Sequence, residues 1–385
     1  MLDVAVVGAG PAGATAAHLL AEAGARVALL EKASLPRTKT CGGGIVGRAF
    51  QWLATDIAPA VEHTCWTATV SLRGERVVVC HRDRPLIRMT MRAVLDALLA
   101  EAAAAAGADL RPQCRVTAME TTERAVRLTT DRGTVDASLV ICADGATSPV
   151  ARQAGWSPAH SAIPALEMEA EVDDATLRRF HQSARFDFGL PRDGYAWVFP
   201  KAAHLSIGVL STRRGSINLR AALRSYLRQL GIVPLAGDVS GAVIPIRPVP
   251  GPWMRNRVLV VGDAAGFVDP LLAEGISAAA LSARMAATAI AESEMHPAAT
   301  SRAYHHKLRS VLLPDLRSAA RLSRLVYTPR PVQTAVYRTF APALAEALAD
   351  VVAGLATYRE ALTRPGLRLA PPLGAIARIL IPRAS

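Results

Sequence analysis

The sequence of 385 residues has few cysteines and no long apolar run. Its five cysteines are an odd number and include no CxxC pair, so the sequence indicates neither a disulfide framework nor a metal site. We therefore expect a reducing, cytoplasmic location. No stretch offers the roughly 18 uninterrupted apolar residues that a membrane-spanning helix needs. The apolar start at Leu2 also lacks the basic leader of a signal peptide.

Acidic residues are scarce relative to basic ones. The chain has 32 Asp and Glu against 44 Lys and Arg, which gives a formal net charge of +12. This balance favours an anionic partner, such as nucleic acid, a phosphate-bearing metabolite or an acidic membrane surface. A general compositional bias toward Arg and Ala explains it equally well. With 51% hydrophobic residues, the chain is long enough to bury a large core in about two or three domains.

The first 31 residues have the pattern of a dinucleotide-binding βαβ unit. A strand expected over 3–7 leads into GAGPAG at 8–13, which fits GxGxxG, and a helix is expected to follow. Gly8 permits the tight turn, Gly10 lets a pyrophosphate approach the backbone, and Gly13 allows close packing of helix and strand. The helix N-terminus directs free N–H groups at the phosphates. Glu31, at the end of the next expected strand, favours FAD or NAD over NADP because it accepts hydrogen bonds from a ribose.

A second motif lies far downstream. Residues 258–269 read VLVVGDAAGFVD, a short apolar strand followed by Gly262-Asp263 and a turn of small residues. Together with ADGATS at 143–148 and Arg92 on an expected helix over 91–106, this motif resembles the flavoprotein family that includes aromatic hydroxylases and geranylgeranyl reductases. The resemblance implies FAD as the cofactor. The cofactor-binding residues that it implies, with those of the first motif, are Gly8, Gly10, Ala12, Gly13, Glu31, Lys32, Cys41, Gly42, Gly43, Gly44, Arg92, Val116, Asp144, Gly145, Gly262, Asp263, Gly275 and Ile276.

Two further segments resemble the geranylgeranyl reductase branch of that family. PRTKTCGGG at 36–44 is similar to its PxxKxCGGG loop, in which Cys41 would lie near the flavin and donate a proton or shape the pocket. A buried small hydrophobe is the alternative reading of Cys41. The segment 191–200 is similar to PxxxYxWxFP, and its period of two puts Tyr195, Trp197 and Phe199 on one strand face, ending at Pro200. An ordinary sheet core uses the same residue types. One departure is Ala273, where the branch has glycine.

The order of motifs predicts an α/β protein. We expect a Rossmann-type FAD-binding domain, an inserted antiparallel-sheet substrate domain and a helical C-terminal region. The FAD-binding domain is expected to be discontinuous. The expected ranges are 1–75, 90–160 and 255–295 for the FAD-binding domain, 76–89 and 161–254 for the substrate domain, and 296–385 for the C-terminal region.

The resemblance implies a reductase that saturates double bonds of an isoprenoid chain or a related apolar substrate, with Cys41 as the candidate proton source and Tyr195, Trp197, Phe199 and Pro200 at the substrate. The alternatives are an FAD monooxygenase of a hydrophobic or aromatic molecule and a prenyl-chain escort protein. No second GxGxxG appears, so we expect a transient electron donor, either NAD(P)H or a ferredoxin-like protein. We expect no nucleic-acid partner. A peripheral contact of 374–383 with the inner membrane face is weighed against a packed helical cap.

Overall fold

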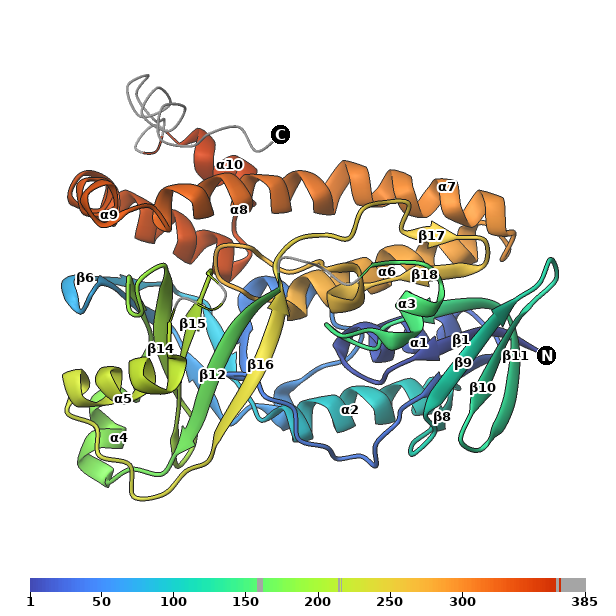
Figure 1. The fold of residues 1–385 in the computed structure, drawn as a ribbon, viewed down its shortest axis with the longest axis horizontal. Coiled ribbons are helices and arrows are strands. Elements are labelled where there is room, and N and C mark those ends of the chain that lie inside the picture. The colour runs from blue at the N-terminus through green and yellow to red at the C-terminus, as the bar shows by residue number, and fades with distance from the viewer. Residues whose placement is uncertain (158–161, 214, 216, 365–366, 368–385) are drawn as a thin grey trace.

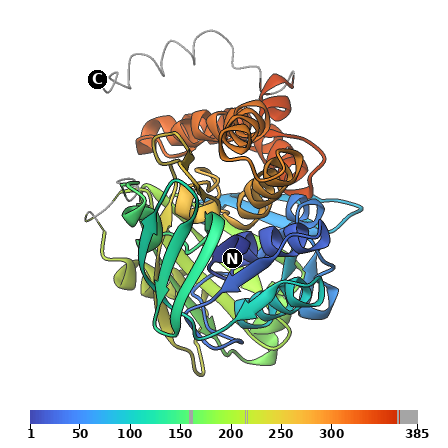
Figure 2. The same cartoon turned by 90° about the vertical axis from the view of Figure 1, so that its right-hand side faces the viewer.

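The computed structural model describes residues 1–157, 162–213, 215, 217–364 and 367. Two large sheets lie side by side, and the C-terminal helices run across them (Figure 1). Seen from the end, these helices form a separate layer above the sheets (Figure 2).

The first sheet has eight strands, and its centre is parallel. Strands β1 and β2 are runs of apolar residues, as expected where both faces of a parallel sheet are covered. Helix α1 packs against α2 and α6. The strands in spatial order are β17 (Met254–Arg255), β18 (Val258–Val260), β11 (Gly133–Cys142), β1 (Leu2–Val7), β2 (Val27–Leu30) and β8 (Asp109–Arg111), with β10 (Val126–Thr130) and β9 (Val116–Thr121) joined to β11. The helices of this layer are α1 (Pro11–Glu22), α2 (Arg92–Ala105), α3 (Pro149–Gln153), η3 (Gly262–Ala265) and α6 (Ile276–Glu292).

The second sheet has seven strands, all antiparallel except the pairing of β5 with β13. Its outer face carries α4 (Asp174–Phe180) and α5 (Leu219–Leu230). The strands in spatial order are β16 (Val239–Pro245), β12 (Ala162–Ala170), β15 (Leu205–Ser211), β14 (Gly194–Pro200), β13 (Ser183–Phe188), β5 (Thr67–Leu72) and β6 (Glu75–His81). A small third sheet joins β3 (Gly44–Val46), β7 (Ile87–Met89) and β4 (His63–Cys65), near the short helices η1 (Gly47–Gln51) and η2 (Ala58–Ala60).

This architecture confirms the expected fold class, a Rossmann-like parallel sheet with a separate antiparallel sheet and C-terminal helices. Strand β5, placed in the FAD-binding domain by the boundary at residue 75, lies in the second sheet because it pairs with both β6 and β13. The domain division stays a prediction.

Strand β14 is buried on both faces and carries different side chains on each. Ala196 and Val198 belong to the outer core cluster, which also contains residues of α4 and α5. Tyr195, Trp197 and Phe199 belong to the main core on the inner side. The period of two therefore places the three aromatic rings on the face that looks toward the first sheet.

The C-terminal region is helical. Helices α7 and α8 run on from each other through one π-helical turn, and α9 and α10 pack beside them (Figure 1). The proposed membrane-contacting segment 374–383 lies outside the described residues. Within the described part of the chain, no helix is both long and apolar enough to cross a bilayer. The elements are α7 (Pro297–Lys307), η4 (Leu308–Leu312), α8 (Leu313–Val326), α9 (Arg330–Ala353) and α10 (Tyr358–Thr363).

Candidate active site

The turn between β1 and α1 requires two of its three glycines for steric reasons. A Cβ on Gly8, whose φ is +101°, would lie 2.5 Å from the carbonyl oxygen of Ala143. A Cβ on Gly13 would lie 1.8 Å from the carbonyl oxygen of Gly8. Both positions therefore hold the strand, the turn and the helix in close contact. Ala12 extends the contact, because its Cβ lies against Gly262 of the downstream motif.

Gly10 faces open space beside two cations. The nearest atoms to a Cβ placed there are guanidinium nitrogens of Arg37 at 3.8 Å and Arg92 at 3.9 Å. Gly10 is also the N-cap of α1, with no side chain capping the helix. A bare backbone, unpaired N–H groups and two guanidinium groups form a donor set that fits a pyrophosphate. The sequence reasoning missed Arg37, although it lies inside the 36–44 motif.

Buried carboxylates hold these two arginines. Asp96 accepts two 2.8 Å hydrogen bonds from Arg92 and lies 3.0 Å from Arg37. Burial disfavours the charge of Arg92, yet Asp96 and the Cys41 side chain raise the pKa of Arg92. Glu31 accepts hydrogen bonds from the backbone N–H groups of Ala9 (3.0 Å) and Ala33 (3.1 Å) and pairs with Arg37. Its carboxylate thus stabilises the glycine turn, and its contact with a ribose stays a prediction.

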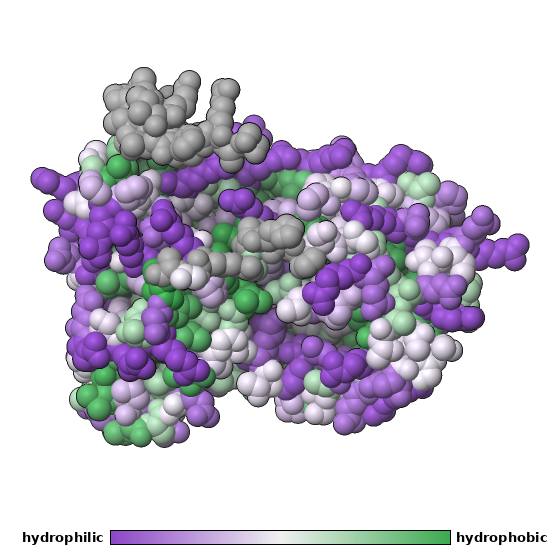
Figure 3. Space-filling model, viewed as in Figure 1, coloured by the Kyte–Doolittle hydropathy of each residue, from purple (hydrophilic) through white to green (hydrophobic). Residues whose placement is uncertain are grey.

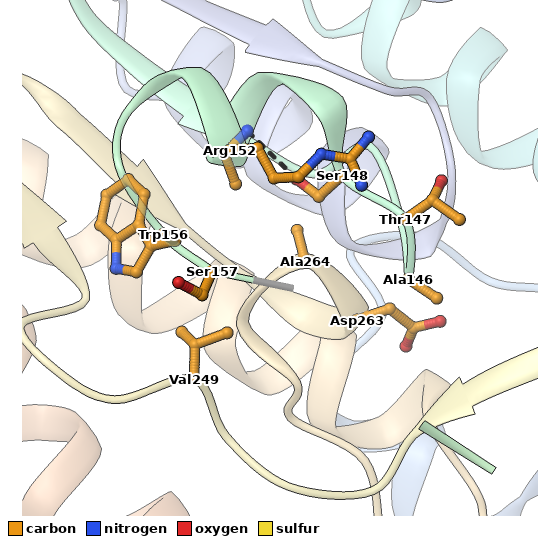
Figure 4. A pocket seen from close by; sticks show the side chains of 10 residues that line it. Ala146, Thr147, Ser148, Arg152, Trp156, Ser157, Val249, Asp263 and Ala264 are labelled. Carbon is orange, nitrogen blue, oxygen red and sulfur yellow. Dashed lines mark hydrogen bonds between the residues drawn. The ribbon is translucent and has the colours of Figure 1, made fainter. Parts of the chain in front are cut away.

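The downstream motif meets the start of α6. A Cβ on Gly275, the N-cap of α6, would lie 2.9 Å from Oδ1 of Asp263, so this carboxylate lies against the first turn of the helix. Gly262 has a φ of +54° and donates its N–H to Ser282. Ile276, the first residue of α6, is buried. Asp263 also lines a pocket with Ala146 and Thr147, so the motif at 258–269 and the motif at 143–148 lie together (Figure 4).

In the motif at 143–148, the aspartate forms hydrogen bonds with residues that follow it in the chain. The Asp144 carboxylate accepts hydrogen bonds from the Ser148 hydroxyl and, at 3.0 Å, from the Val150 N–H at the start of α3. Burial raises the pKa of Asp144. Gly145 follows with a φ of +83°. The positive charge of the exposed Lys32 favours the ionised form of Asp144, so Lys32 lies near this motif.

The triple-glycine loop lies directly on the aromatic face of β14. A Cβ on Gly42 would be 2.9 Å from Nε1 of Trp197 and 3.1 Å from the Phe199 ring. A Cβ on Gly43, whose φ is +67°, would clash with Nζ of Lys201 at 2.3 Å. Gly44 begins β3 and would meet the same Phe199 ring at 3.2 Å. The loop is therefore bare because a strand packs against it.

Two buried charged side chains form hydrogen bonds with the backbone of the triple-glycine loop. Lys201, fully buried, donates hydrogen bonds to the carbonyl oxygens of Gly42 (3.0 Å) and Thr90 (2.8 Å). Glu167, which is 5% exposed, accepts a 2.6 Å hydrogen bond from the Cys41 N–H. The sequence reasoning missed both residues. Lys201 directly follows the 191–200 motif, whereas Glu167 had no signal beyond its place in a strand.

More aromatic side chains join the inner face than the sequence reasoning named. Phe186 and Phe188, from β13, lie 5.2 Å from Phe199 and 5.5 Å from Tyr195 between ring centroids. Tyr195 also donates a 2.5 Å hydrogen bond to the Leu272 carbonyl. It therefore supports the turn before α6 as well as the aromatic face. Pro200 ends β14.

That turn, residues 269–275, is held by a buried ionic cluster. Arg48 contacts Asp269 at 2.7 Å and Glu274 at 3.1 Å. Tyr358 of α10 donates a 2.6 Å hydrogen bond to Asp269. Ala273, the departure from the glycine of the branch, has a φ of +54° in the left-handed region. The turn thus keeps the conformation that favours glycine, at a cost in backbone strain.

The structure brings the predicted cofactor residues together around the β1–α1 turn, the triple-glycine loop and the start of α6. Val116 is apart from these contacts, buried at the start of β9. Which of these residues touch FAD stays a prediction.

Comparison with known proteins decides the family. The profile of a family described as FAD binding domain matches residues 1–214. Digeranylgeranylglycerophospholipid reductase 2 of Methanothermobacter thermautotrophicus is 34% identical over 314 residues, which cover 75% of this chain and 78% of the relative. Chloroplastic geranylgeranyl diphosphate reductase of Arabidopsis thaliana is 31% identical over 360 residues, covering 87% of this chain and 76% of the relative.

The chain belongs to the geranylgeranyl reductase family of FAD-binding oxidoreductases.

A solved structure agrees with this family at the level of the fold. A geranylgeranyl bacteriochlorophyll reductase-like protein from Thermoplasma acidophilum superimposes with a TM-score of 0.78 over 99% of both chains, at 21% identity. The expected cofactor, FAD, and the expected class, an oxidoreductase, are both confirmed. FAD supplies hydride and electron transfer when bound, while the protein binds and orients the cofactor.

Proposed function

We propose that this protein is an FAD-dependent reductase that saturates carbon–carbon double bonds of an isoprenoid, geranylgeranyl-type chain or a related apolar substrate, by hydride transfer from N5 of the flavin. The observation that carries the proposal is the contact between two signature segments about 155 residues apart in sequence. The Cys41–Gly44 loop lies on Trp197 and Phe199, so the two motifs of the reductase branch form one site. Relatives named as reductases of geranylgeranyl groups on different carriers support an isoprenoid chain as the substrate.

The aromatic face suits an apolar chain. Its rings come from β13 and β14 and are buried in the main core. An unactivated alkene offers little charge for the protein to stabilise, so holding it in the reactive position should supply most of the rate enhancement. Aromatic side chains provide large, stiff apolar surfaces for that purpose.

Cys41 is the proposed proton source for the second alkene carbon. It is half-buried and has no disulfide partner. Its sulfur accepts a 3.5 Å hydrogen bond from the Gly43 N–H, and Arg92 lies beside it. A thiol held by a rigid loop, with a cation beside it to stabilise the thiolate that proton donation leaves, fits this role.

The main alternative is an FAD monooxygenase, in which reduced flavin meets oxygen. An escort protein is disfavoured, because a carrier of prenyl chains need not hold FAD. Reduced enzyme should be incubated without oxygen with geranylgeranyl diphosphate and with a geranylgeranyl phospholipid. The proposal expects products that gain two hydrogens for each saturated double bond. Products that instead gain an oxygen atom, and form only when oxygen is admitted, would assign the monooxygenase.

The electron donor is proposed to bind transiently, as NAD(P)H or as a ferredoxin-like protein. One of these two donors should reduce the flavin in the anaerobic enzyme. A loss of flavin absorbance with NADH or NADPH alone would select the nicotinamide, and reduction only with reduced ferredoxin would select the protein.

A peripheral contact with an anionic membrane surface is also proposed. Hydrophilic side chains follow the upper edge of the molecule along α7 and α8 (Figure 3). The sole acidic residue of 297–326 is Asp315, which points inward to Tyr358 and Arg48. Such a surface should attract anionic lipid within a short screening length. The exposed arginines of α7, η4 and α8 are Arg302, Arg309, Arg317, Arg321 and Arg324.

Vesicle sedimentation tests this contact. The protein should sediment with phosphatidylglycerol vesicles at low salt but not with phosphatidylcholine vesicles, and the double variant R317E/R321E should sediment less. Equal sedimentation with both lipids, or none with either, would remove the membrane contact.

A further inference from the structure

Five polar residues lie beside the aromatic rings on the inner face of the second sheet. This inner polar patch consists of Glu167 and Glu169 on β12, Ser206 on β15, and Lys201 and His204 at the turn between β14 and β15. It lies directly below the Cys41 loop, since Glu167 accepts from the Cys41 N–H and Lys201 donates to the Gly42 carbonyl. Glu167 and Lys201 are buried, and buried charged groups need a structural or chemical reason.

Strand register makes Glu167 and Trp197 neighbours. Gly208 pairs with Glu167 on one side and with Trp197 on the other. A Cβ on Gly208 would lie 2.0 Å from the Trp197 ring, so the indole covers this glycine and leans toward β12. The missing side chain at position 208 thus brings the indole and the carboxyl group together on one face.

Two buried polar atoms at the patch lack partners in the described part of the chain. Nε1 of Trp197, in a side chain that is 6% exposed, has no acceptor, and it lies close to Gly42, 2.9 Å from a Cβ placed there. The hydroxyl of Ser206, fully buried and opposite Glu169 in the register, has no partner either. Buried donors are almost always satisfied, so these two indicate that an additional polar molecule, water or substrate, enters this space.

The patch reaches the surface at one end. His204 Nε2 lies 3.0 Å from Oε2 of Glu169, and these side chains are 21% and 28% exposed. Glu169 is two residues from Glu167 on the same strand, so both point to the same face. The patch therefore runs from a half-exposed His–Glu pair to the buried carboxyl beside Cys41.

The groups around Glu167 allow it to hold a proton near neutral pH. Burial raises its pKa to about 7, and the like charge of Glu169 acts in the same direction. The Cys41 N–H, Lys201 and Arg92 oppose that rise. Burial lowers the pKa of Lys201, although the surrounding acids Glu169, Glu62 and Glu167, with Cys41, act against this.

From this geometry we infer that Glu167 resupplies the proton that Cys41 gives to the substrate, and that Glu169 and His204 form the solvent end of the same path. The inference rests on the proposed reductase function. One alkene carbon receives the hydride that the flavin supplies, and the other receives the Cys41 proton. The resulting thiolate takes a proton from the Glu167 carboxyl, which regains one from solvent through Glu169 and His204. Glu167 acts through Cys41 and is a positioning residue in this scheme.

The test compares Glu167→Gln with Glu171→Gln, an exposed acid further along the same chain segment. Glutamine keeps an oxygen that accepts from the Cys41 N–H but cannot release a carboxyl proton. Multiple-turnover alkene reduction by the FAD-bound enzyme, with dithionite as reductant, should slow as pH rises through about 7, because Cys41 must be reprotonated before each new cycle. Glu167→Gln should lose this pH dependence and be roughly 10²-fold slower at acidic pH. Glu171→Gln should match the wild type, and FAD affinity should be the same in all three.

An infrared measurement provides a readout without turnover. A protonated-carboxyl band of the FAD-bound protein should vanish as pH rises through about 7. It should be absent in Glu167→Gln, present in Glu171→Gln, and shifted in Glu167→Asp, which also serves if the glutamine variant fails to fold. Wild-type enzyme without the band, or Glu167→Gln with a wild-type rate and pH profile, overturns the inference while the reductase function stands. A wild type that reduces no prenyl chain refutes the proposed function itself, whatever the infrared band shows.

Discussion

Replacing Arg48 by Met should destabilise the protein strongly, because it removes the cation from a buried ionic cluster. Arg48 lies 2.7 Å from Asp269 and 3.1 Å from Glu274, whose side chains are only 2% and 9% exposed. Its guanidinium also lies 5.4 Å from the centre of the Tyr358 ring. Methionine fills similar space but leaves two buried carboxylates without a cation. Breaking a buried ion pair from one side costs about 3–5 kcal/mol.

The expected cost translates into a clear shift in thermal stability. A chain of 385 residues unfolds with an entropy of about 0.8 kcal/mol/K. The melting temperature of the FAD-saturated protein should therefore fall by about 4–6 °C in Arg48→Met. FAD affinity, measured by flavin fluorescence, should fall as well, because the same cluster holds the turn that leads into α6.

The matched control is Arg26→Met. Arg26 forms an equally short ion pair, 2.7 Å from Asp3, but its side chain is 67% exposed. Solvent screens this pair, so its removal should leave the melting temperature and FAD affinity unchanged. Equal losses in the two variants, or a stable Arg48→Met with normal FAD affinity, would refute the reasoning from burial.

Three further predictions follow from backbone geometry and charge. Gly13→Ala should yield little folded protein, because its Cβ would lie 1.8 Å from a carbonyl oxygen. Gly10→Ala should fold normally but bind FAD more weakly. Circular dichroism and a flavin titration distinguish the two variants, and equal folding of both would contradict the steric account. Ala273→Gly relieves about 1–2 kcal/mol of left-handed strain and gives back about 0.4–1 kcal/mol in unfolded-chain entropy. Its melting temperature should rise slightly, and a clear fall would contradict the strain. Glu167 has a folded pKa of about 7 against 4.5 ordinarily, so its stabilising contribution is complete below 4.5 and is lost as pH rises through 7. The loss amounts to about 3 kcal/mol, and denaturant titrations should show that Glu167→Gln lacks this pH dependence.

The sequence predicted the elements whose residues have only one structural use. GAGPAG at 8–13 predicted the β1–α1 turn, because only glycine fits beside the carbonyls of Gly8 and Ala143. The period of two at Tyr195, Trp197 and Phe199 predicted a shared strand face, and these three side chains lie in one core. The apolar run before Gly262 predicted β18, which lies in the first sheet.

Other features depend on contacts that the sequence does not reveal. The place of β5 in the second sheet depends on its parallel partner, β13, which is more than 100 residues away in the sequence. Glu167, Lys201 and Arg48 are ordinary charged residues in the sequence, and only tertiary packing buries them. Helix α5 had a local signal, since Asn218 caps its start and Gly231 ends it in a left-handed conformation, but the alternation of the surrounding strands obscured it.

The central claim is that the flavin of this protein reduces prenyl double bonds without oxygen. Reduced enzyme should be mixed anaerobically with a geranylgeranyl substrate in a stopped-flow spectrometer, and the products analysed by mass. The account predicts that oxidised-flavin absorbance returns upon mixing, with one double bond saturated for each flavin reoxidised. A flavin that stays reduced until oxygen is admitted, with no saturated product, would contradict it.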